Sequence, residues 1–283
     1  MTVTPPASLA NRVIRIDDPA DPRIAGFRDI RERDLRRRHG SFIVEGAVVL
    51  PVLLDAHEGG RFCAESVLIL ENRLEGFAER LERLPADVPI HVAPRAVIDA
   101  VAGFPMHRGV LALARESEAA SAPLDFHAMA GNALVVAGQA IANHDNMGGI
   151  LRNAAVFGAD GALFDAQSCD PLYRKAIRVS VGGVLRVPFE HGGTGLSMVE
   201  RLAANGFTVI GLSPRGEHDL ETVPIEGRTA LLLGTEGPGL TEGMLSRVTS
   251  ARISQAPGMD SLNVATASGI ALYTLARRMG RIA

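Results

Sequence analysis

Polar residues and glycines gather in three short segments, each of which follows an apolar run. Residues 143–153 hold asparagines, a glycine pair and Arg152; residues 233–240 form a glycine-rich stretch with one carboxylate, Glu236; residues 253–264 lead into an apolar C-terminal stretch. Open α/β sheets bind their ligands where strands end and loops begin. Amide, guanidinium and carboxylate groups at such a place can orient a substrate and stabilise charge that develops on it. The three segments therefore predict one ligand site.

Taken singly, each segment is weak evidence for a site. The sequence GTEGPG lacks the lysine of a phosphate-binding P-loop and the spacing of GxGxxG, so alone it indicates a glycine turn. Asn146 alone is typical of a turn. We expect Arg152 in the first turn of a helix, where a cation opposes the helix dipole, which favours a ligand for its guanidinium. His39, His107 and His144 receive no role.

Taken together and in this order, the segments resemble the motifs of the SpoU, or TrmH, family of RNA ribose methyltransferases within the SPOUT superfamily. The first motif, N-x-G-x-I-x-R followed by FG, matches Asn146, Gly148, Ile150, Arg152, Phe157 and Gly158. The second, G-x-E-G-x-G, matches Gly234, Glu236, Gly237 and Gly239, and the third, S-L-N-V, matches Ser261 to Val264. A lesser pattern, R-x-S-x-G followed by a strand with proline, matches Arg178, Ser180, Gly182 and Pro188.

The resemblance extends over nearly the whole chain. FIVEG and HRGVLALA, within residues 42–114, are similar to the family's small substrate-binding domain, which is related to ribosomal protein L30e. The resemblance implies an α/β fold in which a C-terminal parallel sheet carries a deep trefoil knot, preceded by this small L30e-like α/β domain. It also implies a homodimer with the active site near the interface, in agreement with an apolar final helix.

The activity that the resemblance implies is transfer of a methyl group from S-adenosylmethionine to a ribose 2'-hydroxyl, in ribosomal RNA or alternatively transfer RNA, without a metal. The catalytic residues would be Asn146, Arg152, Glu236, Ser261 and Asn263. The cofactor would contact Leu212, Gly234, Thr235, Gly237, Gly239, Ile253, Leu262 and Asn263. Because a guanidinium stays protonated, we expect Arg152 to stabilise the developing alkoxide while a phosphate or water takes the proton. For Glu236 and Asn263, bracing of the loop or knot is the alternative.

One departure from the family pattern lies in the third segment. The family's motif usually begins I-P-M, whereas this chain has Ile253, Ser254 and Gln255. The resemblance implies that loss of the proline loosens the cofactor loop or tunes its affinity.

The elements that must position these residues follow from hydrophobic periodicity. Strands are predicted at residues 41–46, 66–72, 89–94 and 109–115, and then at 133–141, 161–165, 185–189, 207–213, 229–235 and 251–255. Helices are predicted at 46–57, 75–84, 95–104, 148–158, 174–183, 195–206 and 262–279, the last with Ser261 as N-cap. The polar, Pro-containing stretch around 114–125 looks like a linker. We predict a substrate-binding domain over 1–117, a linker over 118–130 and a methyltransferase domain over 131–283.

The composition of the chain excludes several classes of protein function. A net charge of −3 argues against a protein that coats nucleic acid through bulk electrostatics, although arginines cluster between Arg28 and Arg38, which indicates either a solvated helix face or an RNA contact. Cys63 and Cys169 fit neither a disulfide framework nor a zinc site. No apolar run is long enough to span a membrane and no signal peptide is evident, so we expect a cytoplasmic protein.

Two other classes of function compete. A non-catalytic RNA-binding or ribosome-assembly protein could use the same scaffold, but retention of Asn146, Arg152, Glu236 and Asn263 argues against it. A nucleotide-binding oxidoreductase built on GTEGPG would need a GxGxxG turn followed by an acidic ribose ligand, which is absent, so it ranks last.

Overall fold

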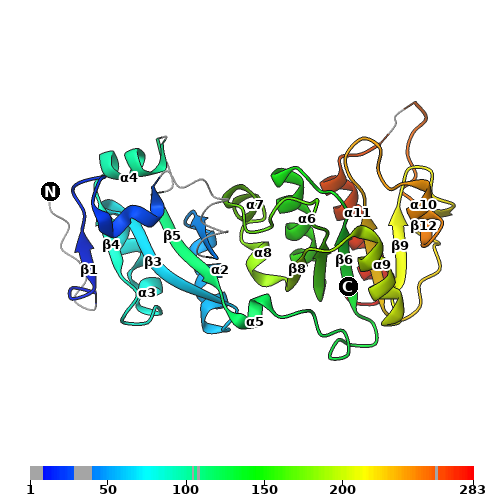
Figure 1. Cartoon of the computed structure of the whole chain (residues 1–283), viewed down its shortest axis with the longest axis horizontal. Coiled ribbons are helices and arrows are strands. Elements are labelled where there is room, and N and C mark those ends of the chain that lie inside the picture. The colour runs from blue at the N-terminus through cyan, green and yellow to red at the C-terminus, as the bar shows by residue number, and fades with distance from the viewer. Residues whose placement is uncertain (1–8, 29–39, 104, 107–108, 259–260) are drawn as a thin grey trace. The chain divides into compact units, whose positions relative to one another are not determined.

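The computed structural model describes residues 9–28, 40–103, 105–106, 109–258 and 261–283. The chain divides into two compact units (Figure 1). Unit 1 comprises Met1–Ser121 together with Leu172–Arg178, and unit 2 comprises Ala122–Pro171 and Val179–Ala283. A short piece from the middle of the chain therefore folds with unit 1, which the sequence did not predict.

Unit 1 is built on a mixed sheet. Its strands run in the order β1-β4-β3-β5-β2, in which β5 is antiparallel to both neighbours and the other pairs are parallel. Their bounds are β1 Val13–Arg15, β2 Ser41–Glu45, β3 Phe62–Leu70, β4 Ile90–Ala93 and β5 Val110–Glu116. Buried residues such as Leu68, Val97 and Leu111 form a core between the sheet and its helices.

Three helices of unit 1 begin close to the predicted positions, namely α2 Val49–Glu58, α3 Leu74–Glu82 and α4 Arg95–Ala102. The shorter helices η1 Pro22–Phe27, η2 Glu71–Arg73 and α5 Glu118–Ser121 were not predicted. The inserted segment brings α7, Arg174–Val179, to this unit. There the carboxylate of Glu45, only 4% exposed, accepts hydrogen bonds from Arg174 at 2.8 Å and Arg178 at 3.4 Å. A buried carboxylate needs such cations to offset its desolvation.

Unit 2 is built on a sheet in which every strand pair is parallel. The strand order is β10-β12-β9-β11-β6-β7-β8. The bounds are β6 Leu134–Gly138, β7 Gly161–Phe164, β8 Phe189–His191, β9 Thr208–Leu212, β10 His218–Asp219, β11 Thr229–Leu233 and β12 Thr249–Arg252. The central strands β6 and β11 are buried along their whole length, as expected of a parallel sheet covered on both faces.

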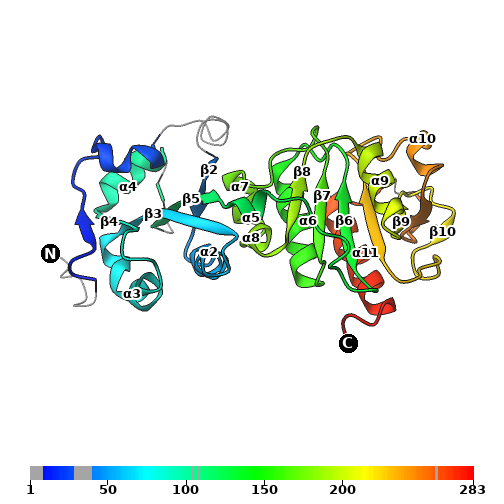
Figure 2. The ribbon, with the colours of Figure 1, turned by 60° about the horizontal axis from the view of Figure 1, so that its bottom comes forward.

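Helices cover both faces of this sheet (Figures 1 and 2). On one face, α9 (Gly195–Ala204) and α10 (Glu242–Leu245) pack through Met198, Leu202 and Met244 against alternate residues of the central strands. On the other, α6 (His144–Val156) packs against α11 (Val264–Arg278) and α8 (Gly183–Arg186). Within the described residues, no helix is both long and apolar enough to cross a bilayer.

One strand prediction was wrong, and two short strands were missed. Residues 185–189 do not form a strand throughout, because Gly183–Arg186 is a helical turn and β8 begins only at Phe189. Gly182, at φ 81°, begins that turn in a backbone conformation that glycine adopts readily. The short edge strands β1 and β10 were also not predicted, because neither has enough residues for an alternating pattern.

Candidate active site

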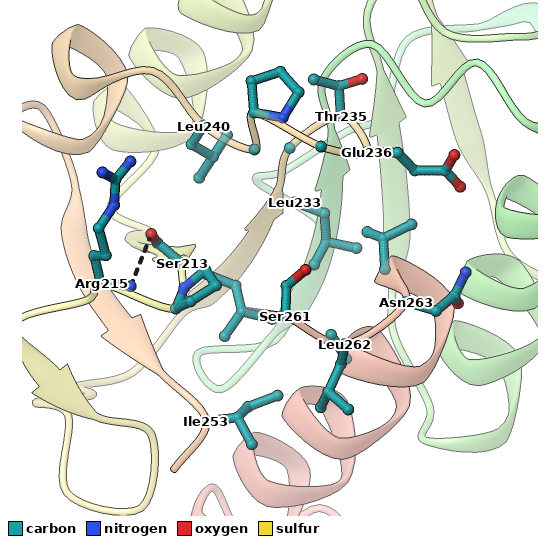
Figure 3. Close-up of a pocket in the computed structure, with 18 of the residues that line it drawn as sticks. Ser213, Arg215, Leu233, Thr235, Glu236, Leu240, Ile253, Ser261, Leu262 and Asn263 are labelled. Atoms are coloured by element: carbon teal, nitrogen blue, oxygen red, sulfur yellow. Dashed lines mark hydrogen bonds between the residues drawn. The ribbon is translucent and has the colours of Figure 1, made fainter. Parts of the chain in front are cut away.

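A cavity of about 630 Å³ lies at the carboxyl ends of β9, β11 and β12 (Figure 3). Its volume is in the range of pockets that bind small molecules. The walls are the loops that leave these three strands, together with the start of α11. The lining residues are Leu212–Arg215, Leu233–Leu240, Ile253, Gln255, Ser261–Val264 and Ala267. The three strands belong to one parallel sheet, so their carboxyl ends meet at one edge, as the sequence predicted for a ligand site.

The second segment forms the upper wall as a closed glycine turn. The N–H of Gly239 donates to the carbonyl of Thr235 at 3.2 Å, and Gly237 and Gly239 adopt φ of 80° and 68°. A Cβ on Gly234 would lie 2.5 Å from the backbone nitrogen of Leu240. A side chain at position 234 would therefore clash with the backbone of the closed turn, which explains why glycine stands there.

The third segment ends on a cap for α11 rather than at Ser261. Asn263 is the N-cap, because its Oδ1 accepts hydrogen bonds from the N–H groups of Ala265 at 2.9 Å and Thr266 at 3.2 Å. The prediction of Ser261 as N-cap was wrong by two residues; an asparagine caps a helix as well as a serine does, so composition alone did not separate them. Ser261 lies exposed on the cavity wall instead.

The cap also fixes the two asparagines relative to each other. Because the Oδ1 of Asn263 accepts from backbone N–H groups, its amide nitrogen faces Asn146 and donates to the Oδ1 of Asn146 at 2.9 Å. The amide nitrogen of Asn146, which is only 4% exposed as a residue, is left buried without an acceptor among the described residues. An unpaired buried donor is costly, so this nitrogen is a candidate to meet an oxygen atom of a ligand.

Asn146 lies beside a second hollow of about 320 Å³. Thr235, Glu236 and Val264 line this hollow as well as the larger cavity, so the two share a wall. Glu236 is exposed, and Figure 3 shows its carboxylate on the side of the cavity where Asn263 lies. Glu236 and Arg215 are the charged side chains among the described residues that line the larger cavity. The shared wall allows two molecules to be held with one carboxylate between them.

Arg152 does not occupy the first turn of its helix, so that prediction was wrong. Asn143 caps α6 through a hydrogen bond to its Oδ1 from the N–H of Asp145 at 2.7 Å, and α6 begins at His144. Arg152 therefore lies in the third turn, beyond the first-turn reach of the helix dipole. It is exposed, lines neither hollow, and follows Asn146 by about 9 Å along the helix axis.

Arg152 shares its face of α6 with apolar side chains. Val156, one turn further on, is 65% exposed, and the neighbouring ring of Phe157 contacts that of Tyr273 on α11 at 5.8 Å between centroids. Ile270 and Tyr273 are exposed to 39% and 45%. Close packing joins α6 and α11 beneath this face: the amide of Asn153 donates to the carbonyl of Ala265 at 2.8 Å and to the buried hydroxyl of Ser268 at 2.9 Å.

The structure thus brings together most of the residues expected at the site. All eight expected cofactor contacts line the larger cavity, namely Leu212, Gly234, Thr235, Gly237, Gly239, Ile253, Leu262 and Asn263. Of the expected catalytic residues, Glu236, Ser261 and Asn263 line it, Asn146 lines the neighbouring hollow, and Arg152 lines neither. Sequence reasoning missed Arg215, an exposed loop residue at the cavity whose type carries no local signal, and it placed Gln255 in the cofactor loop without assigning it a contact.

Comparison with known sequences identifies relatives over nearly the whole chain. The model of the SpoU rRNA methylase family matches residues 133–273, which include all three motif segments. A Mycobacterium bovis protein named as an uncharacterized tRNA/rRNA methyltransferase is 35% identical over 271 residues, which cover 92% of this chain and 90% of that protein.

Comparison with solved structures finds the same fold. An AdoMet-bound rRNA methyltransferase from Sinorhizobium meliloti superposes with a TM-score of 0.78 at 22% identity, covering 94% of this chain and 98% of that one. A structure described as an RNA 2'-O ribose methyltransferase also gives a TM-score of 0.78, at 23% identity, with coverage of 95% and 100%.

Proposed function

Because the chain belongs to the SpoU rRNA methylase family, we propose that it is an RNA methyltransferase that transfers a methyl group from S-adenosylmethionine to a ribose 2'-hydroxyl. The observation that carries this proposal is the pair of adjoining hollows that share Thr235, Glu236 and Val264. The larger one suits S-adenosylmethionine, and the smaller one, beside the buried amide of Asn146, suits a ribose.

The chemistry of the larger cavity fits S-adenosylmethionine. Leucine and isoleucine side chains, including Leu212, Leu233 and Ile253, offer an apolar surface for adenine, and the glycine turn offers backbone groups for its polar edges. Glu236 and Arg215 can pair with the ammonium and carboxylate of the methionine part. The fit also agrees with the AdoMet bound to the similar Sinorhizobium meliloti enzyme. The proposed reaction uses no metal.

The sulfonium supplies a methyl carbon that is already activated, so the protein's task is to align the 2'-oxygen and help it lose its proton. The oxygen forms a bond to the methyl carbon as the carbon–sulfur bond breaks, and the proton leaves to water or a phosphate. Asn146 would donate its unpaired N–H to the ribose while Asn263 holds it in place. Correct alignment of this kind can lower a barrier by about 7 to 11 kcal/mol. Glu236 and Ser261 would orient the neighbouring groups.

We assign Arg152 the role of stabilising the developing alkoxide, since its guanidinium stays protonated. Because Arg152 is exposed and lines neither hollow, its assigned role would require a second chain to complete the site. Val156, one turn after Arg152 on α6, and Ile270 and Tyr273 on the neighbouring α11 are exposed apolar side chains of the kind found at protein interfaces. We therefore propose a homodimer through α6 and α11, in which Arg152 would lie at the interface near an active site.

The dimer can be tested separately from the activity. Light scattering after size-exclusion chromatography should give twice the chain mass of 29.9 kDa for the wild type. Val156→Asp, which introduces a charge into the proposed interface, should give the single-chain mass, whereas Val48→Asp, at a similarly exposed valine of unit 1, should not. A monomeric wild type at micromolar concentration would overturn the dimer.

The fold-level proposals follow from the same family membership. We propose that the segments around Gly234, Ile253 and Leu262 form a deep trefoil knot, and that residues 1–117 form an L30e-like RNA-binding domain joined by residues 118–130 to the catalytic domain of 131–283. A cytoplasmic location suits an RNA substrate. The predicted RNA contact of the arginine cluster from Arg28 to Arg38 lies outside the described residues except for Arg28. His39 and His107 also lie outside them.

We propose a structured site in ribosomal RNA as the substrate, with transfer RNA as the alternative. The test is mass-spectrometric mapping of 2'-O-methylated nucleotides in total ribosomal and transfer RNA from cells with and without the gene. Loss of one mark that the wild-type gene restores and Arg152→Ala does not would establish both chemistry and substrate. If no ribose mark changes and the purified protein does not bind S-adenosylmethionine, the enzyme proposal fails in favour of a non-catalytic RNA-binding role.

A further inference from the structure

Ile253, Gln255 and Ser261–Asn263, from the loop between β12 and α11, line the larger cavity, but the described residues of this loop have few attachments to the rest of unit 2. It leaves β12 at Ile253 and enters α11 at Asn263. Among its described residues, hydrogen bonds to other parts of the chain are made only by Ser254 and Asn263. The attachment at Asn263 is the bond to Asn146. Beyond its continuation from β12, the other end of the loop is attached by a hydrogen bond only through Ser254, among the described residues.

Ser254 faces away from the cavity. Its neighbours Ile253 and Gln255 both line the cavity, whereas Ser254 does not, as expected where alternate residues of an extended segment point to opposite sides. The hydroxyl of Ser254 instead donates to the Oδ2 of Asp219, at the end of the edge strand β10. Ser254 does not line the cavity, but it can hold the backbone between two residues that do.

Asp219 is a firm attachment point because its own position is determined by several bonds. Its Oδ1 accepts from the N–H of Glu221 at 2.9 Å, and its carbonyl accepts from the N–H of Val223 at 2.8 Å. The turn that follows is joined to the far end of α11, since Arg278 donates to the carbonyls of Leu220 at 2.9 Å and Val223 at 2.7 Å. The turn is thus bound to the helix whose first residues line the cavity.

We propose that the Ser254–Asp219 hydrogen bond is a positioning device that holds the start of this loop, Ile253 to Gln255, in the conformation that binds S-adenosylmethionine. The inference rests on the proposed function, because it assigns that molecule to the cavity. Without the bond, the loop would sample positions in which Ile253 and Gln255 do not line the cavity, and the cosubstrate would have to restore order on binding. A hydrogen bond of ordinary net strength corresponds to a change of about two- to tenfold in an equilibrium constant.

The test is calorimetric titration of the full-length protein with S-adenosylmethionine, which needs no knowledge of the RNA target. Ser254→Ala should raise the dissociation constant about three- to tenfold, while Ser254→Thr, which keeps the hydroxyl, should bind as the wild type does. Asp219→Ala should also weaken binding. The variant carrying both changes should bind no worse than the weaker single variant, because both remove the same bond. Ser246→Ala is the matched control: its exposed hydroxyl donates to the carbonyl of Gly243 at 3.2 Å, away from the cavity lining.

The outcomes separate the two proposals. A wild type that binds S-adenosylmethionine together with a folded Ser254→Ala that binds equally well would overturn the positioning role and leave the proposed function standing. Additive losses in the doubly substituted variant would also overturn it, since they would show that the two residues act independently. A wild type that does not bind S-adenosylmethionine would refute the proposed function itself, and this inference with it.

Discussion

The turn at Gly234 offers a sharp test of the cavity's construction. In Gly234→Ala, the new Cβ would lie 2.5 Å from the nitrogen of Leu240 and 2.6 Å from the carbonyl carbon of Gly239. Both are backbone atoms, so no side chain can rotate away to make room. The shorter contact is about 0.9 Å below the 3.4 Å at which ordinary van der Waals contact begins, so the wall from Thr235 to Leu240 must move by roughly that much.

A displacement of this size is large for a binding wall. Misplacement of a reacting group by about 1 Å can lower a reaction rate on the order of 100-fold where a site depends on precise geometry. We expect Gly234→Ala to raise the dissociation constant for S-adenosylmethionine at least about tenfold, which is about 1.4 kcal/mol of binding free energy. Overpacking should also lower the free energy of unfolding by about 1 to 3 kcal/mol, and urea denaturation measures that change alongside calorimetric titration.

Gly243→Ala is the matched control for this substitution. Gly243 lies in α10 of the same unit, and a Cβ there meets nothing within 4 Å. Replacing a helical glycine with alanine should leave binding unchanged and stabilise the fold by about 0.5 to 1 kcal/mol. If Gly234→Ala is folded and binds S-adenosylmethionine as tightly as Gly243→Ala does, the close approach at Gly234 does not shape the site and the reasoning is refuted.

Other residues of unit 2 give further predictions. Asn153→Ala removes two hydrogen bonds between α6 and α11, so the free energy of unfolding in urea should fall by about 1 to 3 kcal/mol; no change would mean that these bonds contribute nothing net. Asn263→Ala should lower the same quantity by about 0.5 to 2 kcal/mol through loss of the α11 cap. Asn263→Asp, which keeps an oxygen at the cap, should retain most of that stability. Burial, reinforced by the charge of Asp170, raises the pKa of Cys169 to about 11, so at pH 8.5 little thiolate is present. Iodoacetamide should therefore label Cys169 at least about tenfold more slowly in the native protein than in urea, as followed by peptide mass spectrometry; equal rates would contradict the buried environment.

The parts of the fold that sequence reasoning predicted well are those with a strong local pattern. The strands β6 and β11 are short runs of aliphatic residues between polar turns, and each was predicted within a few residues of its bounds. The helix α9 follows a capping box formed by Thr194 and Ser197, and it lies where periodicity placed it. The second and third motif segments line one cavity because each follows a strand of the same parallel sheet, and the first, which follows β6, lines the adjoining hollow through Asn143 and Asn146.

The parts that could not be predicted depend on contacts between distant residues or on a choice between equivalent caps. Asn143 and Asn263 are the N-caps of α6 and α11, although neighbouring residues could also have capped these helices. Because α6 begins earlier than predicted, Arg152 lies in its third turn and not in its first. The bond from Ser254 to Asp219 joins residues 35 positions apart on a loop and an edge strand, where no periodicity exists. Whether the departure at Ser254 alters cofactor affinity stays a prediction.

The excursion of Leu172–Arg178 into unit 1 limits how the two units can be exchanged in evolution or in the laboratory. The polypeptide passes from one unit to the other at three places, so cutting after Ser121 does not release an intact unit 1. Such a fragment would keep the buried Glu45 but lose the guanidinium groups of Arg174 and Arg178 that accompany it. A chimaera that takes its first 121 residues from a relative must therefore take residues 172–178 from the same parent. Recombination between relatives should have kept these two stretches together, as a pair inherited jointly despite the 50 residues that separate them.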